Sequence, residues 1–332
     1  MMPLKIVDSF GRVHNNLRIS VTDRCNIRCF YCMPNENVRF LPQKQILTFE
    51  EIERLTRISS GLGVDRIRIT GGEPLVRSEL EKLIAMIVKI DGIENVALTT
   101  NGVLLADQAE SLRAAGLNRI NISLDTLDED TFFRLSRRKG LQRVLDGIDA
   151  AIEAGFEKVR LNAIAIAGLT DDEVLPLVRF AIKKDLEIRF IEFMPLDAEE
   201  NWEDDQVLTG EKIKGIVEKE FGQLEPCHRS DQSQPAVDFQ LVTGAGRIGF
   251  INPISQPFCS TCNRLRLTAE GKIRNCLFST SEWDAMELIR GGASDEEVAN
   301  LILDCVANKK ASHGIDSEEF SRPAKAMYQI GG

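Results

Sequence analysis

Strand-like and helix-like segments alternate along the first 192 residues of this 332-residue chain. Each strand-like segment is short, has apolar side chains at every second position, and is separated from the next by a segment with helical periodicity. Such alternation predicts right-handed βαβ units that build one parallel sheet with helices packed outside it. We expect six strands, at residues 17–21, 66–70, 96–100, 119–123, 158–165 and 186–192.

Several of these strands are polar on one face, which is unusual for a parallel sheet. In the second strand Ile67 and Ile69 alternate with Arg68 and Thr70, and later strands repeat the pattern. The apolar positions are expected to pack on the helices, and the polar positions to face a cavity. The predicted fold class is α/β, an incomplete (β/α)6 TIM-like barrel whose functional groups lie at the C-terminal ends of the strands.

The alternation stops after Pro195, which divides the chain into two regions. We predict a partial barrel at 1–195 and a C-terminal extension at 196–332 that carries short strands, helices, a second cysteine group and a Gly-Gly tail. A Ser/Thr-x-x-Glu pattern, typical of a capping box, predicts helix starts at four places in the chain. These places are Thr48, Ser78, Thr170 and Ser294.

The charge balance argues against polyanionic partners. Lys plus Arg number 41 and Asp plus Glu number 51, so the net charge is -10. Such a chain lacks the broad positive field that captures nucleic acid or anionic membranes, so we expect neither partner. No apolar run reaches the ~18 residues of a spanning helix, and residues 1–10 lack a signal-like apolar core. An anionic ligand would need a local cluster of arginines.

Eight cysteines are sparse for a disulfide scaffold, and six of them form two tight groups. We therefore expect reduced thiolates that hold metal in a cytoplasmic protein. The first group is Cys25, Cys29 and Cys32, spaced C-x3-C-x2-C with no fourth ligand nearby. A structural zinc site normally has four protein ligands. A three-thiolate iron–sulfur cluster leaves one iron open to bind another molecule, which is the interpretation we favour.

The second group, Cys259, Cys262 and Cys276, also lacks an obvious fourth ligand. Cys227 or Cys305 is an alternative fourth ligand that would close a zinc or iron–sulfur site. Two arginines follow Cys262 on one face of a predicted strand, and their forked guanidinium groups suit oxyanions and base edges. This neighbourhood favours an open cluster with a polar or anionic ligand.

The run from Cys25 to Cys32 resembles the C-x3-C-x-aromatic-C signature of the radical S-adenosylmethionine (SAM) superfamily. There the open iron of a [4Fe–4S] cluster chelates SAM, and reduction cleaves SAM to a 5′-deoxyadenosyl radical. Gly71-Gly72-Glu73-Pro74 resembles the superfamily's GGEP motif, which holds the amino group of SAM. Glycine lets the backbone approach a ligand closely, and Glu73 supplies an acceptor. The resemblance implies SAM contacts from Tyr31, Gly72, Ser123 and Met194.

The chain as a whole resembles the GTP 3′,8-cyclase family. The matching stretches are residues 17–26, 70–77, 99–102, 190–194, 258–277 and 330–332. The resemblance implies two [4Fe–4S] clusters, with SAM on the first and the guanine of GTP on the open iron of the second. It implies GTP contacts from Arg18, Arg68, Thr99, Arg160, Arg189, Arg264, Leu265 and Arg266. Arg160 stands where the family commonly has Lys, so a planar fork replaces a point cation.

The resemblance also implies the reaction and its partners. A radical removes the ribose 3′ hydrogen, and the 3′ carbon bonds to guanine C8. The product is (8S)-3′,8-cyclo-7,8-dihydroguanosine 5′-triphosphate, in the first step of molybdenum cofactor biosynthesis. Such a lyase needs an external one-electron donor, passes its product to a cyclic pyranopterin monophosphate synthase, and is a monomer or homodimer. The Gly-Gly tail resembles a flexible family element that reaches into the active site.

Two alternatives stay open at this point. A peptide-modifying radical SAM enzyme with an auxiliary cluster shares the first motif and has extra C-terminal cysteines, although it usually has more than three of them. A non-enzymatic protein that holds zinc or iron–sulfur clusters at both groups would need only the thiolates. Iron content and a GTP-dependent assay distinguish these alternatives from the cyclase.

Overall fold

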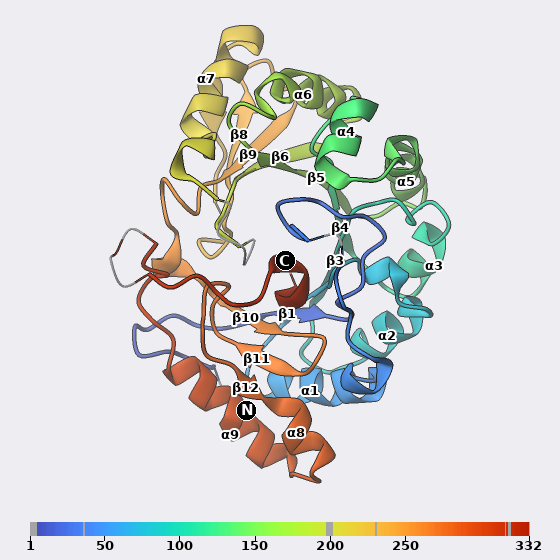
Figure 1. The fold of residues 1–332 in the computed structure, drawn as a ribbon, viewed down its shortest axis with the longest axis vertical. Helices are drawn as coiled ribbons and strands as arrows, with labels where there is room; N and C mark the ends of the chain where they lie inside the picture. The colour runs from blue at the N-terminus through green and yellow to red at the C-terminus, as the bar shows by residue number, and fades with distance from the viewer. Residues whose placement is uncertain are drawn as a thin grey trace.

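The computed structural model describes residues 5–35, 37–196, 202–229, 231–315, 317 and 320–331. Strands line the inside of an open ring, and helices cover its outside (Figure 1). The six barrel strands are β1 (Asn16–Ser20), β2 (Arg66–Thr70), β3 (Asn95–Thr100), β4 (Arg119–Ser123), β5 (Lys158–Ala165) and β6 (Glu187–Glu192). They pair in parallel and in chain order, which confirms the predicted partial α/β barrel.

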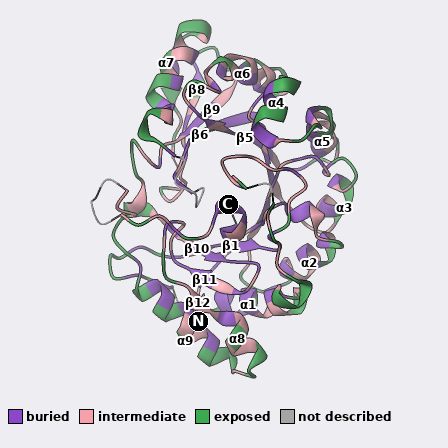
Figure 2. Cartoon of the chain, in the orientation of Figure 1, coloured by how far each residue is buried: buried purple, intermediate pink, exposed green. Residues whose placement is uncertain are grey.

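Helices fill the connections between these strands and cover the outer face of the sheet (Figure 1). They are α1 (Phe49–Gly61), α2 (Leu80–Ile87), α3 (Ala109–Ala114), α4 (Glu129–Ser136), α5 (Leu141–Glu153) and α6 (Val174–Lys183). The apolar strand positions pack against them, as Ile67 and Ile69 do at 2% and 0% exposure. Buried residues therefore concentrate between sheet and helices, while the outward helix faces are exposed (Figure 2).

The C-terminal strands extend the same sheet at both of its edges. On one side β10 (Arg264–Leu267) pairs in parallel with β1, and β11 (Lys272–Arg274) and β12 (Trp283–Asp284) follow it antiparallel. On the other side β9 (Arg247–Ile251) pairs in parallel with β6, followed by β8 (Val237–Leu241) and β7 (Leu224–Pro226). The barrel wall is thus longer than the six strands that the sequence predicts for residues 1–195.

The last described residues lie inside the ring (Figure 1). The short helix α10 (Met327–Ile330) ends at Gly331, whose carbonyl accepts a hydrogen bond of 2.6 Å from Arg266 Nη1. A Cβ on Gly331 would meet the Ser20 side chain at 2.7 Å, so only glycine fits there without a shift. The tail therefore reaches into the barrel as expected and is held there up to Gly331, while Gly332 lies outside the described residues.

The remaining helices, α7 (Gly210–Phe221), α8 (Ala285–Arg290) and α9 (Asp295–Ala307), pack outside the C-terminal strands. Among the helices of the described ranges, none is both long and apolar enough to cross a membrane.

The predicted capping boxes fall into two pairs. Thr48 and Ser294 form theirs, at the starts of α1 and α9. The other two predictions are wrong, because neither side chain caps its helix. Before α2 the N-cap is Glu79, in the left-handed region with φ 61°, and no side chain caps the helix. Thr170 Oγ1 accepts instead from Ile166 N at 2.9 Å, so a 3-10 turn precedes α6.

Candidate active site

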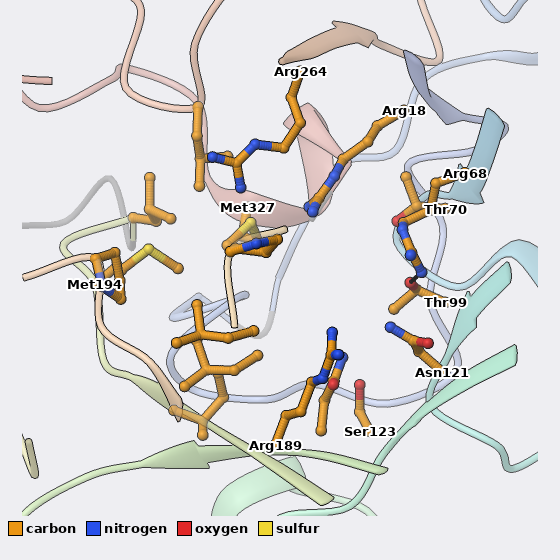
Figure 3. Close-up of a pocket in the computed structure, with 18 of the residues that line it drawn as sticks. Arg18, Arg68, Thr70, Thr99, Asn121, Ser123, Arg189, Met194, Arg264 and Met327 are labelled. Atoms are coloured by element: carbon orange, nitrogen blue, oxygen red, sulfur yellow. Dashed lines mark hydrogen bonds between the residues drawn. The ribbon is translucent and has the colours of Figure 1, made fainter. Parts of the chain in front are cut away.

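A cavity of about 410 Å³ occupies the lumen of the barrel. The polar face of the strands lines it, together with both cysteine groups. Arg18 and Arg264 point into it from one side and Arg189 from the opposite side (Figure 3). The cavity brings together nearly all the site residues that the sequence predicts: Arg18, Tyr31, Arg68, Gly72, Thr99, Ser123, Arg160, Arg189, Met194, Arg264, Arg266, and the cysteines 25, 29, 32, 259, 262 and 276.

Leu265 is the exception among the predicted site residues. Its side chain is 1% exposed and belongs to the hydrophobic core, because alternation along β10 turns it away from Arg264 and Arg266. Neither Cys227 nor Cys305 lines the cavity. Cys305 is buried in the core, so the structure does not bring these two thiols together with the second cysteine group as a fourth ligand.

The first cysteine loop follows β1 and is held by its own backbone. Cys32 N and Met33 N both donate to Cys29 O, at 3.0 and 2.7 Å. Arg28 Nη1 closes the other end of the loop by donating to Cys25 O at 2.6 Å. Asn101 Nδ2, at the end of β3, lies 3.7 Å from Cys25 Sγ. The three thiols are therefore fixed at one end of the cavity.

Burial shapes the acidity of these thiols. It raises the pKa of Cys25 to about 11 and that of Cys32 to about 12. The thiolate is the metal-binding form of cysteine. The first group therefore needs a metal cation to ionise at neutral pH, which fits a metal centre and does not fit a free nucleophile.

The glycine turn after β2 packs directly on the segment that precedes Cys25. Gly72 N donates to Thr22 O at 2.7 Å, and Glu73 N donates to Arg24 O at 2.8 Å. A Cβ on Gly72 would lie 2.5 Å from Arg24 O, so any other residue would push the two loops apart.

Glu73 has a structural task in addition to the acceptor role expected for it. Its carboxylate accepts hydrogen bonds from Leu75 N, Thr100 Oγ1 and Asn101 N, at 3.0, 2.6 and 2.6 Å. Burial is the largest influence on this carboxyl group and raises its pKa to about 7. Glu73 thus joins the glycine turn to the end of β3, where Asn101 faces the first cysteine loop.

The second cysteine group lies across the cavity, on segments that flank β10. Cys259 begins a 3-10 turn (Cys259–Thr261), and Cys276 follows β11. Arg264 donates to Cys262 Sγ through Nε at 3.3 Å and Nη2 at 3.2 Å, and Lys309 Nζ lies 3.5 Å from the same sulfur. Burial opposes ionisation of Cys262, but these two cations outweigh it and lower its pKa to about 6.

The donor sets fit iron–sulfur clusters better than single metal ions. Throughout the described ranges, no three or more His, Cys, Asp or Glu side chains converge closely enough to hold one metal ion. A structural zinc site normally has four protein ligands around one point, and a catalytic zinc site has three. The thiolates of a cluster bind separate irons, so they need not converge, and three of them leave one iron open. Cysteines 25, 29 and 32 and cysteines 259, 262 and 276 are the residues that would hold two such clusters.

The wall between the two cysteine groups is built from arginines on neighbouring strands. Arg18 pairs in register with Arg266 on β10 and with Arg68 on β2. Burial and the neighbouring arginines lower the pKa of Arg68 well below its ordinary value, and burial with Arg264 nearby lowers that of Arg18 to about 10. The arginines of the cavity wall therefore repel one another.

Carboxylates relieve only part of this charge. Glu187 pairs with Arg160 at 2.9 Å and with Arg189 at 2.6 Å, and Asp238 pairs with Arg189 at 3.1 Å. Within the described part of the chain, Arg18 and Arg68 have no carboxylate partner, and Arg18 Nε has no hydrogen-bond partner at all. An anion in the cavity would supply the missing negative charge.

Sequence reasoning missed several residues that the fold brings to this cavity. Arg66 and Arg119 share the polar face that the alternation identified, so the same signal could have found them. Asp125 accepts from Tyr31 Oη at 2.5 Å and fixes the ring of the cysteine-loop tyrosine. Lys309 had no local signal, because it lies 33 residues after Cys276 on an unrelated helix end.

An open parallel barrel, a three-cysteine loop after its first strand and a glycine turn after its second define the class of the radical SAM enzymes. In agreement, residues 19–181 match the model of the Radical SAM superfamily. Residues 186–315 match a second model, described as Molybdenum Cofactor Synthesis C.

Full-length relatives identify the family within that class. A GTP 3′,8-cyclase of Rhodopirellula baltica is 53% identical over 333 residues, which cover 99% of this chain and 93% of that protein. A GTP 3′,8-cyclase of Pelotomaculum thermopropionicum is 42% identical over 325 residues, covering 98% and 99%. The chain therefore belongs to the GTP 3′,8-cyclase family.

Solved structures support the fold. Streptococcus suis SuiB bound to the precursor peptide SuiA is similar over 92% of this chain and 67% of that chain, with a TM-score of 0.65 and 18% identity. Native anSMEcpe with bound AdoMet is similar over 94% and 93%, with a TM-score of 0.58 and 15% identity. At these identities the likeness concerns the fold alone, so the choice of substrate rests on the full-length relatives and the cavity.

Proposed function

We propose that this chain cyclises GTP to (8S)-3′,8-cyclo-7,8-dihydroguanosine 5′-triphosphate, the first step of molybdenum cofactor biosynthesis. Family membership supports this activity. One structural observation supports the barrel cavity as the site where GTP binds. That observation is the position of Arg18 and Arg68 between two three-cysteine groups, where neither arginine pairs with a carboxylate of the described residues. A triphosphate supplies several negative charges to such a wall, whereas a neutral peptide supplies carbonyl acceptors but no negative charge.

The cavity residues suggest how GTP lies. The guanine lies beside the second cysteine group, where Arg264 and Arg266 present donors from the same face of β10. The triphosphate extends across the lumen to Arg68, Arg160 and Arg189, with Thr99 Oγ1 held 3.2 Å from Arg68 Nη1. Arg18, between the two ends, is placed to contact either. Of Leu265 only the backbone can take part, because its side chain is in the core.

Arg160 stands where the family commonly has Lys. Its guanidinium is 2.9 Å from Glu187, which also holds Arg189. This shared carboxylate fixes the planes of both guanidinium groups against the end of the sheet. A planar fork can offer two parallel donors to one phosphate, which a lysine ammonium cannot. We therefore propose that Arg160 binds phosphate, as the family's lysine does, through a more directional contact than a lysine ammonium makes.

The cofactors are two [4Fe–4S] clusters and SAM. When bound at the first cysteine group, cluster and SAM together supply a carbon radical able to remove the ribose 3′ hydrogen atom. The chain's own part is positioning: Gly72, Tyr31, Ser123 and Met194 line the side of the cavity proposed for SAM. Asp125 orients Tyr31 through its 2.5 Å hydrogen bond. The barrel wall keeps the ribose between the two ends and limits access of water.

An anaerobic assay tests the proposal. The reconstituted protein is incubated with SAM, a strong reductant and GTP that carries deuterium at the ribose 3′ carbon. We expect 5′-deoxyadenosine to form only with GTP and to carry one deuterium, together with a cyclised nucleotide of the same elemental composition as GTP. Formation of 5′-deoxyadenosine that is indifferent to GTP contradicts the proposal and favours the peptide-modifying alternative. Zinc in place of about eight irons per chain would support the non-enzymatic alternative.

The partners follow from the same proposal. The first cluster requires an external one-electron donor, and the triphosphate product is handed to a cyclic pyranopterin monophosphate synthase. The net charge of -10 supports the absence of nucleic-acid and membrane partners. Unpaired thiols at all eight cysteines support a cytoplasmic location. We propose a monomer or homodimer, which sedimentation of the anaerobic protein would distinguish.

A further inference from the structure

Lys309 is a buried cation at the second cysteine group that the proposed reaction leaves unassigned. Its side chain lies just beyond the C-terminal end of α9, and the residue is 5% exposed. In the described ranges no carboxylate lies within ion-pair distance of its ammonium group. The anionic groups that act on it are the thiolates of Cys262 and Cys276. A buried ammonium requires a compensating anion, so its counter-charge must come from this cysteine group.

Three hydrogen bonds fix the Lys309 ammonium. Nζ donates to Asn275 O at 2.7 Å, to Arg264 O at 3.1 Å and to Cys262 Sγ at 3.5 Å. These acceptors lie on two separate segments, one carrying Cys262 and the other leading into Cys276. All three protons of the ammonium group are used. Lys309 thus joins the two stretches that hold the second cysteine group.

The segment after Lys309 completes the connection to the third cysteine. Arg12 Nη1 donates to Cys259 O at 2.8 Å and to Ala311 O at 2.9 Å. Arg12 Nη2 also donates to Lys310 O at 2.7 Å. Residues 309–311 therefore contact, directly or through Arg12, every stretch that carries a ligand of this group.

We propose that Lys309 is a positioning residue that holds the second cysteine group in place and raises the reduction potential of the cluster bound there. This inference rests on the second cluster of the proposed function. A positive charge and an N–H···S contact at a ligand sulfur favour the more negatively charged, reduced form of a cluster. Arg264 adds two such contacts, but it also faces the substrate, whereas Lys309 serves the sulfur and the backbone alone.

The test compares Lys309→Met with Lys310→Met in the anaerobic holoenzyme. Lys310 is the matched control because its side chain is exposed, so that substitution removes the same charge one residue away. Iron content and an EPR-monitored redox titration of both clusters are measured for each protein. We expect about eight irons per chain in both variants. In Lys309→Met we expect one of the two midpoint potentials to fall by at least about 59 mV. For one electron this shift is a tenfold decrease in the ratio of reduced to oxidised cluster at a fixed potential.

Two outcomes overturn the inference. One is an unshifted pair of potentials in Lys309→Met with all irons present. The other is an equal shift in Lys310→Met. Adding GTP to the wild-type protein tests the proposed function separately, because GTP should perturb the signal of the same cluster whose potential Lys309 sets. Absence of that perturbation would count against the proposed function while the Lys309 comparison still stands.

If Lys309→Met loses iron, two further variants separate the loss of the cluster from the loss of the charge. Lys309→Gln keeps N–H donors but not the charge, and we expect it to retain both clusters with one lowered potential. Lys309→Arg keeps the charge, and we expect both potentials to lie near those of the wild-type protein. If all three variants lose the same four irons while Lys310→Met keeps eight, Lys309 is only a scaffold and its effect on the potential is refuted.

Discussion

Glu187 offers a sharp test of the charge balance in the cavity wall. Its side chain is 5% exposed and pairs with Arg160 and Arg189. Burial acts to raise the pKa of Glu187, but the two arginines outweigh burial and lower it below the ordinary value of 4.5. The stabilisation by this carboxylate is therefore complete at neutral pH and is lost only as the pH falls below about 4.5. Measurements near pH 7.5 thus report the charged pair.

Substituting Glu187→Gln keeps the shape of the side chain and removes its charge. Removing one partner of a buried pair typically costs about 3–5 kcal/mol. We expect the lower end, about 3 kcal/mol, because Arg189 keeps Asp238 at 3.1 Å while Arg160 loses its carboxylate. For 332 residues the entropy of unfolding is roughly 0.7 kcal/mol per kelvin, so the apparent Tm should fall by roughly 4 °C.

The assay is anaerobic thermal unfolding of reconstituted protein, with and without saturating GTP. GTP should narrow the Tm gap between the variant and the wild-type protein, because its phosphates supply the charge that Glu187 no longer provides. Glu220→Gln is the matched control: it removes a glutamate charge from the exposed pair with Arg179, worth about 0–1 kcal/mol. Equal Tm values for wild type and Glu187→Gln, or a gap that GTP leaves unchanged, would refute the reasoning.

Three further predictions concern single side chains. Arg266→Ala should keep about eight irons per chain but lose GTP-dependent formation of 5′-deoxyadenosine, and normal turnover in that variant would remove its substrate role. Gly72→Ala should abolish SAM binding, measured by equilibrium dialysis, because its Cβ would lie 2.5 Å from Arg24 O; undiminished binding would show that the two loops can separate at no cost. Cys305→Ala should also retain about eight irons, and a loss of four would make Cys305 a cluster ligand after all.

Local sequence patterns predicted the barrel because they depend on neighbours only a few residues away. The alternation along β2 correctly placed the buried Ile69 away from the cavity and Arg68 and Thr70 on its lining. The capping box at Thr48 formed as predicted, with Glu51 N donating to Thr48 Oγ1 and Thr48 N donating to the Glu51 carboxylate. The patterns at Ser78 and Thr170 did not cap their helices. Thr170 shows why, since its hydroxyl is taken by Ile166 N in the preceding loop.

Long-range features could not be predicted from the sequence, because they depend on residues that are far apart in the chain. Nothing near Arg264 indicates that its strand pairs with β1, 248 residues earlier, through Asn16. The link from Arg12 to Cys259 O spans 247 residues, and the contact of Lys309 with Cys262 Sγ spans 47. Such contacts are set by the order in which distant strands pair, so a pattern of spacing along one segment cannot reveal them.

The sheet register explains why the C-terminal region cannot be a simple appendage to the barrel. Because β10 pairs with β1 on one edge and β9 with β6 on the other, the extension covers both edges that residues 1–195 would leave unpaired. The same pairing sets Arg266 directly beside Arg18, which is itself beside Arg68. Extending the sheet at the β1 edge therefore builds the cation wall and brings the second cysteine group to the same cavity as the first. The triphosphate of the proposed substrate supplies negative charge to this arginine-lined space.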